Sequence, residues 1–203
     1  MSLLRRLFNQ KFKSKDKADS AQKSDKSSYY PEKQLPADED FMLNFKNNGG
    51  KFIYCENWDE VLEMFDNILL ENDWYEKDVF CYDEKLCQKF DGFNLKFGTN
   101  PDSSFFLLTC ESLIARSGAI MLSSNQIKEK RLGALPHHFV IVATTSQIVE
   151  TISEGLRTIN SRQSGSIPSN ITTIRHFKEL EEKDFLTYGS STKNLYLLLL
   201  EDL

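Results

Sequence analysis

The stretch from Lys51 to Tyr82, KFIYCENWDEVLEMFDNILLENDWYEKDVFCY, decides the fold class. It begins with a short apolar strand at Lys51 to Cys55 and ends with a second one at Val79 to Tyr82. Between them, Asn57 can cap a helix, because its side chain accepts hydrogen bonds from the N–H groups of a first turn. This helix has apolar residues at amphipathic spacing, namely Val61, Leu62, Met64, Phe65, Ile68 and Leu69. A strand, a helix and a strand in succession favour parallel strands with helices on the sheet faces.

Further helices and strands are expected on both sides of this stretch. A helix from Ala37 through Phe45 should end at Gly49 and Gly50, because glycine readily takes the backbone conformation that ends helices. A short helix and a strand are expected between Leu86 and Leu95. Downstream, the apolar or strand-like segments are Phe105 to Ile114, Gly118 to Ser123, Phe139 to Ala143 and Leu195 to Leu200. The sequence therefore predicts an α/β fold with a mostly parallel sheet and flanking helices.

Two of the later segments have a more specific interpretation. Ser146 is expected to cap a helix that carries Ile148, Val149, Ile152, Leu156 and Ile159, and Asn160 to Asn170 is expected to be a loop. The final strand, Leu195 to Leu200, is apolar without alternation, which is typical of a strand buried on both faces of a sheet.

The N-terminal segment differs in composition from the rest of the chain. Residues 1–28 hold eight lysines and arginines against three aspartates, a net charge of +5, which leaves −10 for the remainder of a chain whose total is −5. Residues 1–36 contain little that could be buried, so we expect a disordered basic tail, followed by one domain over residues 37–203. Leu3, Leu4, Leu7 and Phe8 beside Arg5 and Arg6 indicate either a short amphipathic helix for an anionic surface or an ordinary solvated tail.

Composition also excludes several classes of protein. An acidic domain argues against nucleic acid as a partner, because phosphates need basic residues. The longest apolar runs are far shorter than the roughly 20 residues of a membrane span, and no signal peptide is recognised, so a cytoplasmic protein is expected. The four cysteines form no Cys-x-x-Cys pair and predict free thiols, without a bound metal or cofactor. Motifs of nucleotide-binding loops, dinucleotide-binding turns and serine hydrolases do not occur.

The second half of the domain resembles a known family. Cys110 to Ser123, CESLIARSGAIMLS, is similar to a segment of the lactate-utilisation (LUD) domain family in which Ile-Ala-Glu-Thr/Ser-Gly leads into a strand. Arg131 to Val142, RLGALPHHFVIV, resembles the family's arginine, Leu-Pro, histidine and strand block. Gln147 to Val149 and Leu195 to Asp202 resemble its next helix start and its closing strand, and the likeness is good over Thr109 to Leu156.

The resemblance carries expectations about fold and function. It implies a fold similar to that of the ribose-phosphate isomerase, glucosamine-phosphate deaminase and CoA-transferase group. It also implies a place in a cytoplasmic system that oxidises lactate beside iron–sulfur proteins, where a chain without cluster-binding cysteines would be an accessory member. The alternative that it leaves open is an enzyme of the same fold group, a sugar-phosphate isomerase or a CoA-transferase-like protein.

The chain departs from the family near its end. Members usually carry Gly-Pro-Ser-Arg-Thr-Ala-Asp-Ile-Glu, where this sequence has Ile167 to Arg175, IPSNITTIR. An ungapped alignment replaces the aspartate by Thr173 and the glutamate by Arg175. Gly189 to Thr192 replaces the family's Gly-x-His-Gly-Pro, so its histidine is also absent. Because a carboxylate pair and a histidine are groups that move protons, any independent activity that depends on them should be weak or absent.

Three segments are candidates for binding a small organic anion or a phosphate. In Arg116-Ser117-Gly118, backbone N–H groups and the Arg116 charge could meet an anion, or the glycine could simply form a tight turn. Arg131 with His137 and His138 is the second candidate, although adjacent strand residues point to opposite faces and an edge histidine is the plainer reading. The third is the loop from Ser161 to Thr173, whose hydroxyl groups include those of Ser169 and Thr173.

One isolated acidic residue and the tail complete the candidates. Glu111 could be a lone acid or base, but a carboxylate on the surface of a helix is the plainer interpretation. The leading hypothesis is an accessory LUD-domain protein that binds a small organic anion or contacts an iron–sulfur redox partner. A module that reaches a membrane or an acidic protein through its basic tail remains a third hypothesis.

Overall fold

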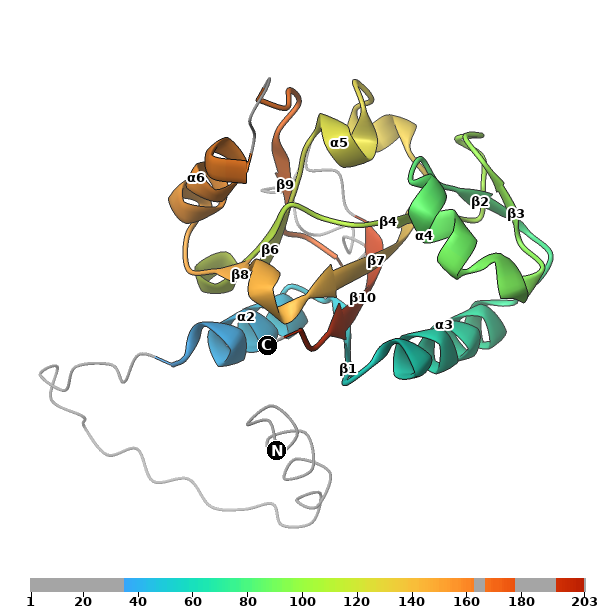
Figure 1. Ribbon diagram of the computed structural model, residues 1–203, viewed down its shortest axis with the longest axis horizontal. Coiled ribbons are helices and arrows are strands. Elements are labelled where there is room, and N and C mark those ends of the chain that lie inside the picture. The colour runs from blue at the N-terminus through green and yellow to red at the C-terminus, as the bar shows by residue number, and fades with distance from the viewer. Residues whose placement is uncertain (1–34, 163–166, 178–192, 203) are drawn as a thin grey trace, which may run out of the picture.

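The computed structural model describes residues 35–162, 167–177 and 193–202, so the predicted tail lies almost wholly outside the described residues. Six of the described strands form one large sheet in the order β1-β10-β7-β4-β2-β3, in which every neighbouring pair is parallel. Figure 1 shows this sheet with α3 and α4 beside it. The prediction of an α/β fold with a mostly parallel sheet is confirmed. The strands are β1 (Lys51–Cys55), β2 (Asp78–Phe80), β3 (Lys96–Gly98), β4 (Phe105–Leu108), β7 (His138–Thr144) and β10 (Asn194–Leu200).

The helices of the first half begin and end where their sequence signals lie. The Asn57 side chain accepts a hydrogen bond of 2.9 Å from the Glu60 N–H and caps α3, as predicted. The first described helix, α2, starts at Ala37 and stops before Gly49 and Gly50, also as predicted. The described helices are α2 (Ala37–Asn47), α3 (Trp58–Asn72), α4 (Glu84–Lys89), α5 (Ser124–Ile127) and α6 (Ile152–Arg162), with single 3-10 turns η1 (Asp91–Phe93), η2 (Ala115–Ser117), η3 (Leu132–Ala134) and η4 (Thr145–Gln147).

A second, smaller sheet has the order β8-β5-β6-β9 among the described residues. Its strands are β5 (Ser112–Ile114), β6 (Ala119–Leu122), β8 (Ile148–Val149) and β9 (Thr172–Ile174). Strand β6 runs antiparallel to both β5 and β9, whereas β5 and β8 are parallel. The sequence predicted a strand near β6 but did not separate β5 from β4 or predict this sheet.

Two predictions for the chain after β7 are wrong. Ser146 does not cap a helix, because its N–H and its hydroxyl both donate to the Asp202 carboxylate, at 2.9 and 2.6 Å. Ile148 and Val149 are therefore strand residues that pair with β5, and the helix begins only at Ile152. The segment from Ser161 to Thr173 is not entirely loop, since α6 continues to Arg162 and Thr173 lies in β9.

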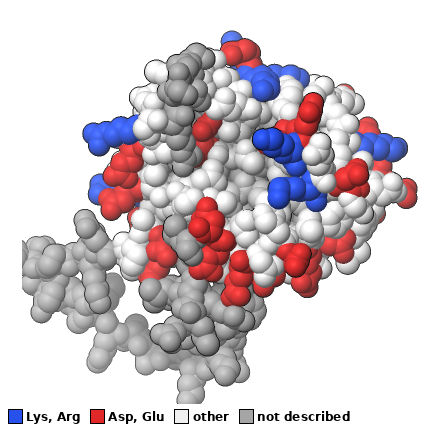
Figure 2. Space-filling view, in the orientation of Figure 1, with Lys and Arg blue, Asp and Glu red and all other residues white. Residues whose placement is uncertain are grey.

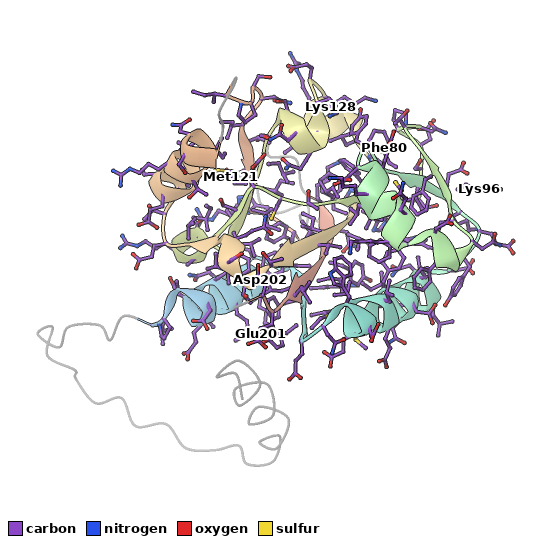
Figure 3. All side chains as sticks on the ribbon, viewed as in Figure 1. Phe80, Lys96, Met121, Lys128, Glu201 and Asp202 are labelled. Atoms are coloured by element: carbon purple, nitrogen blue, oxygen red, sulfur yellow. The ribbon has the colours of Figure 1, made fainter. Side chains whose placement is uncertain are left out.

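Three apolar clusters hold the described elements together. On one face of the large sheet, Phe139 and Leu197 pack with Phe41 and Phe45 of α2 and with the small sheet. On the other face, residues of β7 and β10 pack under α3 and α4. A third cluster, which includes Met121 and Ile159, lies between the small sheet and α6. Figure 3 places Met121 in the small sheet and Phe80 in the large one. Strand β10 contributes to both faces, so its predicted burial on both sides is confirmed.

The parallel arrangement brings several strand ends to one edge of the sheet. In the register of the sheet, Leu200 at the end of β10 pairs with Thr144 at the end of β7, and Leu108 at the end of β4 pairs with Ile141. In open parallel sheets, ligands bind outside the carboxyl ends of the strands. Within the described ranges, no helix is both long enough and apolar enough to cross a membrane.

Candidate ligand-binding pocket

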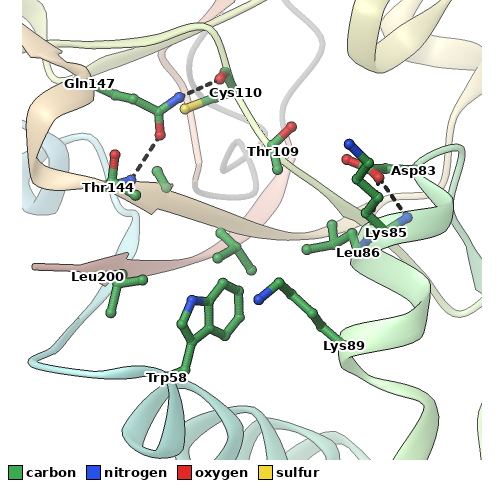
Figure 4. Close-up of a pocket in the computed structure, with 12 residues that line it drawn as sticks. Trp58, Asp83, Lys85, Leu86, Lys89, Thr109, Cys110, Thr144, Gln147 and Leu200 are labelled. Atoms are coloured by element: carbon green, nitrogen blue, oxygen red, sulfur yellow. Dashed lines mark hydrogen bonds between the residues drawn. The ribbon is translucent and has the colours of Figure 1, made fainter. Parts of the chain in front are cut away.

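A pocket of about 360 Å³ lies at the carboxyl ends of β4, β7 and β10, between the start of α3 and α4. Figure 4 shows these elements converging on it. Its size falls at the lower end of the ~300–1,000 Å³ that small-molecule sites occupy. The residues that line it are Trp58, Asp83, Lys85, Leu86, Lys89, Thr109, Cys110, Val142, Ala143, Thr144, Gln147 and Leu200.

Much of the pocket wall is apolar. Val142, Ala143 and Leu200 come from strand ends and are buried, and Leu86 of α4 is buried as well. Trp58 is half-buried at the first position of α3. Leu86, Val142 and Leu200 belong to the cluster under α3 and α4, and Trp58 packs against it. Ala143 belongs to the cluster on the other face of the sheet. The pocket therefore lies at the border of the core, where the strands end.

The charged side chains come from α4 and from the residue before it. Lys89 directs its Nζ over the Trp58 ring, 3.9 Å from the ring centroid, which is a cation–π contact. Asp83 caps α4, because its Oδ1 accepts from the N–H groups of Lys85 and Leu86 at 2.9 and 3.2 Å. Figure 2 shows basic side chains gathered over α4 beside a largely uncharged central area. The pocket rim therefore holds two cations and one carboxylate that already has backbone partners.

Gln147 joins two of the strand ends across the pocket. Its Nε2 donates to the Cys110 carbonyl oxygen at 2.6 Å, and its Oε1 accepts from the Thr144 N–H at 2.8 Å. Figure 4 draws both bonds. The Thr144 hydroxyl lies 3.0 Å from the hydroxyl of Ser146. Both ends of the Gln147 amide are therefore hydrogen-bonded to the backbone. These bonds hold Cys110 and Thr144 in place at the polar side of the pocket.

A smaller cavity of about 30 Å³ adjoins this edge and shares Asp83 and Thr109 with the pocket. That volume suits about one water molecule. Asn125 and Gln126 line it and donate to Glu111 Oε1 at 2.8 and 3.2 Å, and the buried Ser123 hydroxyl donates to the same oxygen at 2.5 Å. The interpretation of Glu111 as a helix-surface carboxylate is wrong, because Glu111 directly precedes β5 and anchors the start of α5.

The Arg116-Ser117-Gly118 segment forms the turn η2 and its C-cap, packed on α2. The Arg116 N–H donates to the Glu150 carbonyl oxygen and the Gly118 N–H to that of Ala115, both at 3.2 Å, so two of the N–H groups are already bonded. The Arg116 guanidinium pairs with the Glu150 carboxylate at 3.4 Å on the exposed surface. Ser117 Oγ is buried without a hydrogen-bond partner in the described part of the chain. Anion binding by this turn stays a prediction.

The other predicted residues lie apart from the pocket. His137 is exposed and precedes β7, at the sheet edge opposite to Thr144, and Arg131 is exposed before η3. Ser169 donates to Glu129 at 2.7 Å, and Thr173 is exposed on β9. None of the seven predicted residues lines the pocket, so the structure does not bring them together there. Their roles also stay predictions.

The sequence contains a signal that points to the pocket. Asp83 follows the second strand of the stretch that decides the fold, and Lys85 and Lys89 lie in the short helix after it. Thr109 follows β4, and Thr144 is the last residue of β7. The rule that ligands bind at the carboxyl ends of parallel strands points to these positions. The segment contains no catalytic or ligand-binding motif, so a motif comparison alone does not find it.

The described residues offer little for metal or thiol chemistry. Among them, histidine, cysteine, aspartate and glutamate form no group of three or more that could hold a metal ion. Burial, with a smaller effect of Glu60, raises the pKa of the Cys55 thiol to about 12, and burial also raises those of Cys81 and Cys87. Since the thiolate is the reactive form, the raised pKa values disfavour thiol chemistry at these cysteines, of which Cys55 and Cys81 are buried and Cys87 is partly buried.

The comparisons with known proteins bear on the family and the fold. The model of the LUD domain family matches residues 99–200, half of the chain. A crystal structure of a DUF162 family protein from Deinococcus radiodurans is similar over 83% of this chain and 100% of that one, with a TM-score of 0.58 and 15% sequence identity. At that identity the likeness shows the fold alone. A comparison with curated proteins found no match. On the family match, with the α/β fold in agreement, this chain belongs to the LUD domain family.

Proposed function

We propose that this protein is an accessory LUD-domain protein of lactate or related 2-hydroxy acid utilisation, and that it binds a small organic anion in the pocket at the carboxyl ends of β4, β7 and β10. The observation that carries the proposal is the pair of lysines, Lys85 and Lys89, beside an apolar wall at the sheet edge where ligands of parallel folds bind. The link to lactate comes from the family.

The electrostatics of the rim support an anion rather than a cation. Asp83 is the one carboxylate among the lining residues, and its Oδ1 already accepts two backbone hydrogen bonds. Lys89 has its Nζ over the pocket's tryptophan, where a carboxylate can reach it from the pocket side. An ammonium–carboxylate hydrogen bond is roughly twice as strong as a neutral one, so Lys89 is the residue we expect to bind the anion directly.

A redox partner is the second part of the proposal. Accessory members of such systems work beside iron–sulfur proteins, and this expectation rests on the family resemblance. Recovery of iron–sulfur proteins with the full-length chain from its native cytosol would support it. Their absence from the recovered proteins would argue against this part alone, because anion binding is measured separately.

We do not extend the proposal to isomerase or CoA-transferase chemistry. A general acid or base has to lie within hydrogen-bond reach of the substrate. Thr173 and Arg175, which take the places of the family's acidic pair in an ungapped alignment, are both exposed, and neither lines the pocket. Glu111 has one oxygen occupied by three donors. Asp83 is the carboxylate among the lining residues, and its Oδ1 already accepts from the backbone of α4, so the family's acidic pair has no counterpart in the pocket.

The test is calorimetric titration of the full-length protein with lactate, pyruvate, propanoate and phosphate. We expect binding of the organic acids, weakened about tenfold in Lys89→Gln, because one charge-assisted hydrogen bond is removed. Lys96→Gln is the matched control, since Lys96 is an exposed lysine on β3 that does not line the pocket (Figure 3). An absence of binding for every organic acid that is titrated, short or long, or an equal loss of binding in both variants, would contradict the proposed function.

A further inference from the structure

We infer that the preferred ligand of the pocket is a carboxylate with an apolar body of several carbons, such as a straight-chain or aromatic acid, rather than a three-carbon 2-hydroxy acid. The inference rests on the proposed function, because it takes the pocket as an anion site and adds the class of acid. Three features of the pocket carry it: its size, the separation of its charged and apolar walls, and the way its polar groups are already used.

The first feature is size. A three-carbon acid would fill only a small part of a pocket of about 360 Å³ and would leave much of the apolar wall in contact with water. Burying apolar surface is favourable in proportion to its area. A longer apolar body gains this free energy, and a lactate-sized ligand does not.

The second feature is the separation of the two kinds of wall. The cations belong to α4 at the exposed rim, whereas Val142, Ala143 and Leu200 are buried at the strand ends. The Trp58 ring lies between them, with Lys89 against its face. A ligand that reaches from the rim to the strand ends therefore needs a negative head near Lys89 and an apolar body along Trp58.

The third feature is the shortage of partners for a 2-hydroxyl group. Gln147 uses its Nε2 and its Oε1 on the backbone of Cys110 and Thr144. The Thr144 hydroxyl is within hydrogen-bond distance of Ser146, and Asp83 bonds to the backbone of α4. Of the neutral polar side chains that line the pocket, Thr109 is therefore left as the partner for a 2-hydroxyl group, and one such hydrogen bond does not outweigh the apolar burial that a longer body gains.

The experiment titrates the full-length protein with lactate, butanoate, hexanoate and octanoate, and with hexan-1-ol and hexylamine as uncharged and cationic controls. We expect binding to tighten about threefold to fourfold for each added methylene until the pocket is full, the equivalent of ~0.8 kcal/mol per CH₂. Hexanoate should bind about tenfold more weakly to Lys89→Gln and normally to Lys96→Gln. It should quench the Trp58 fluorescence of the wild type, and this change should be absent in Trp58→Phe, which keeps an aromatic wall.

Each outcome separates the two proposals. Tightening with chain length together with dependence on Lys89 supports both. If lactate binds as tightly as hexanoate and its binding still depends on Lys89, the inference about ligand class is overturned. The proposed anion site is unaffected by that result. Hexan-1-ol or hexylamine binding as tightly as hexanoate overturns the requirement for a carboxylate. If none of the acids binds, the proposed function fails, and the inference fails with it.

Discussion

At the scale of single residues, Gly118 occupies a position at which the structure requires a glycine. Its φ of +59° lies in the left-handed region, and a Cβ atom there would lie 2.4 Å from Asn44 C and from Phe45 N, both backbone atoms of α2. The Asn44 and Asn48 side chains donate to the carbonyl oxygens of Ala115 and Ser117 in the same turn. Glycine at this position therefore lets α2 pack closely against the turn. This structural role does not depend on whether the turn binds an anion.

Replacement of Gly118 by alanine should lower the free energy of unfolding by about 2–4 kcal/mol, since it combines an unfavourable φ with a clash against backbone atoms. Urea denaturation measures the change. Gly133→Ala is the control, because no atom lies within 4 Å of a Cβ built there, and its effect should stay within about 1 kcal/mol. Equal effects of the two substitutions would show that the close approach of α2 is not what requires a glycine.

At the scale of elements, Lys193 connects the beginnings of β10 and β7. Its side chain is buried, and its Nζ donates to the carbonyl oxygens of Leu135 and Pro136 at 3.0 and 2.9 Å, 5.2 Å from the centre of the Phe139 ring. Burial lowers its pKa from 10.5 to about 8, because the charged form loses hydration. The lysine therefore donates two hydrogen bonds to the loop before β7, and its charged form is destabilised because burial removes water from the ammonium group.

This arrangement predicts a dependence of stability on pH. Between about pH 8 and 10.5 the unfolded chain binds more protons at Lys193 than the folded one, so stability should rise with pH across this window. We expect the free energy of unfolding of the wild type to rise relative to Lys193→Met, by on the order of 1 kcal/mol after partial solvation is allowed for. Urea titrations of both proteins across the window measure the difference. A constant difference would contradict the prediction, and Lys96→Met is the control for loss of an exposed lysine.

Helices and strands also differ in how far their own sequence determines them. Helix α3 was predicted with its cap because a capping side chain and an amphipathic period lie within one continuous segment. Strands β8 and β9 were missed because they are two and three residues long and carry no period of their own. The spacing of Ile148 and Val149 is compatible with a helix as well as with a strand. The bonds between Ser146 and Asp202, which lie far apart in the sequence, are what the local pattern does not contain.

At the scale of the whole molecule, Asp202 ties the chain after β10 to the turn between the two sheets. Its carboxylate accepts from the Thr145 hydroxyl, the Ser146 N–H and the Ser146 hydroxyl at 2.8, 2.9 and 2.6 Å. Figure 3 shows Asp202 near this turn. Burial alone would raise the pKa of Asp202, but the hydrogen bonds from Ser146 and Thr145 outweigh it and lower the pKa from 3.8 to about 2.

Replacement of Asp202 by asparagine should therefore destabilise the protein at neutral pH, by on the order of 1 kcal/mol because the carboxylate is largely exposed to solvent. The folded-state pKa is depressed, so the contribution of the carboxylate is complete above about 3.8 and is lost as the pH falls toward 2. Urea denaturation at neutral and at acidic pH should show the difference between the two proteins shrinking. If the difference were the same at both, the charge of Asp202 would have no part in it.

The sequence by itself determined the class of the fold, because the periods of strands and helices and the capping residues act over a few neighbouring residues. It therefore predicted α2, β1, α3 and the doubly buried β10, and its family resemblance was confirmed. Tertiary structure alone decided the strand order, the small sheet, the network around Glu111 and the pocket. Each of these joins residues that lie far apart in the chain, as Lys89, Thr109 and Leu200 do, and such contacts depend on which packed surfaces meet rather than on any local pattern.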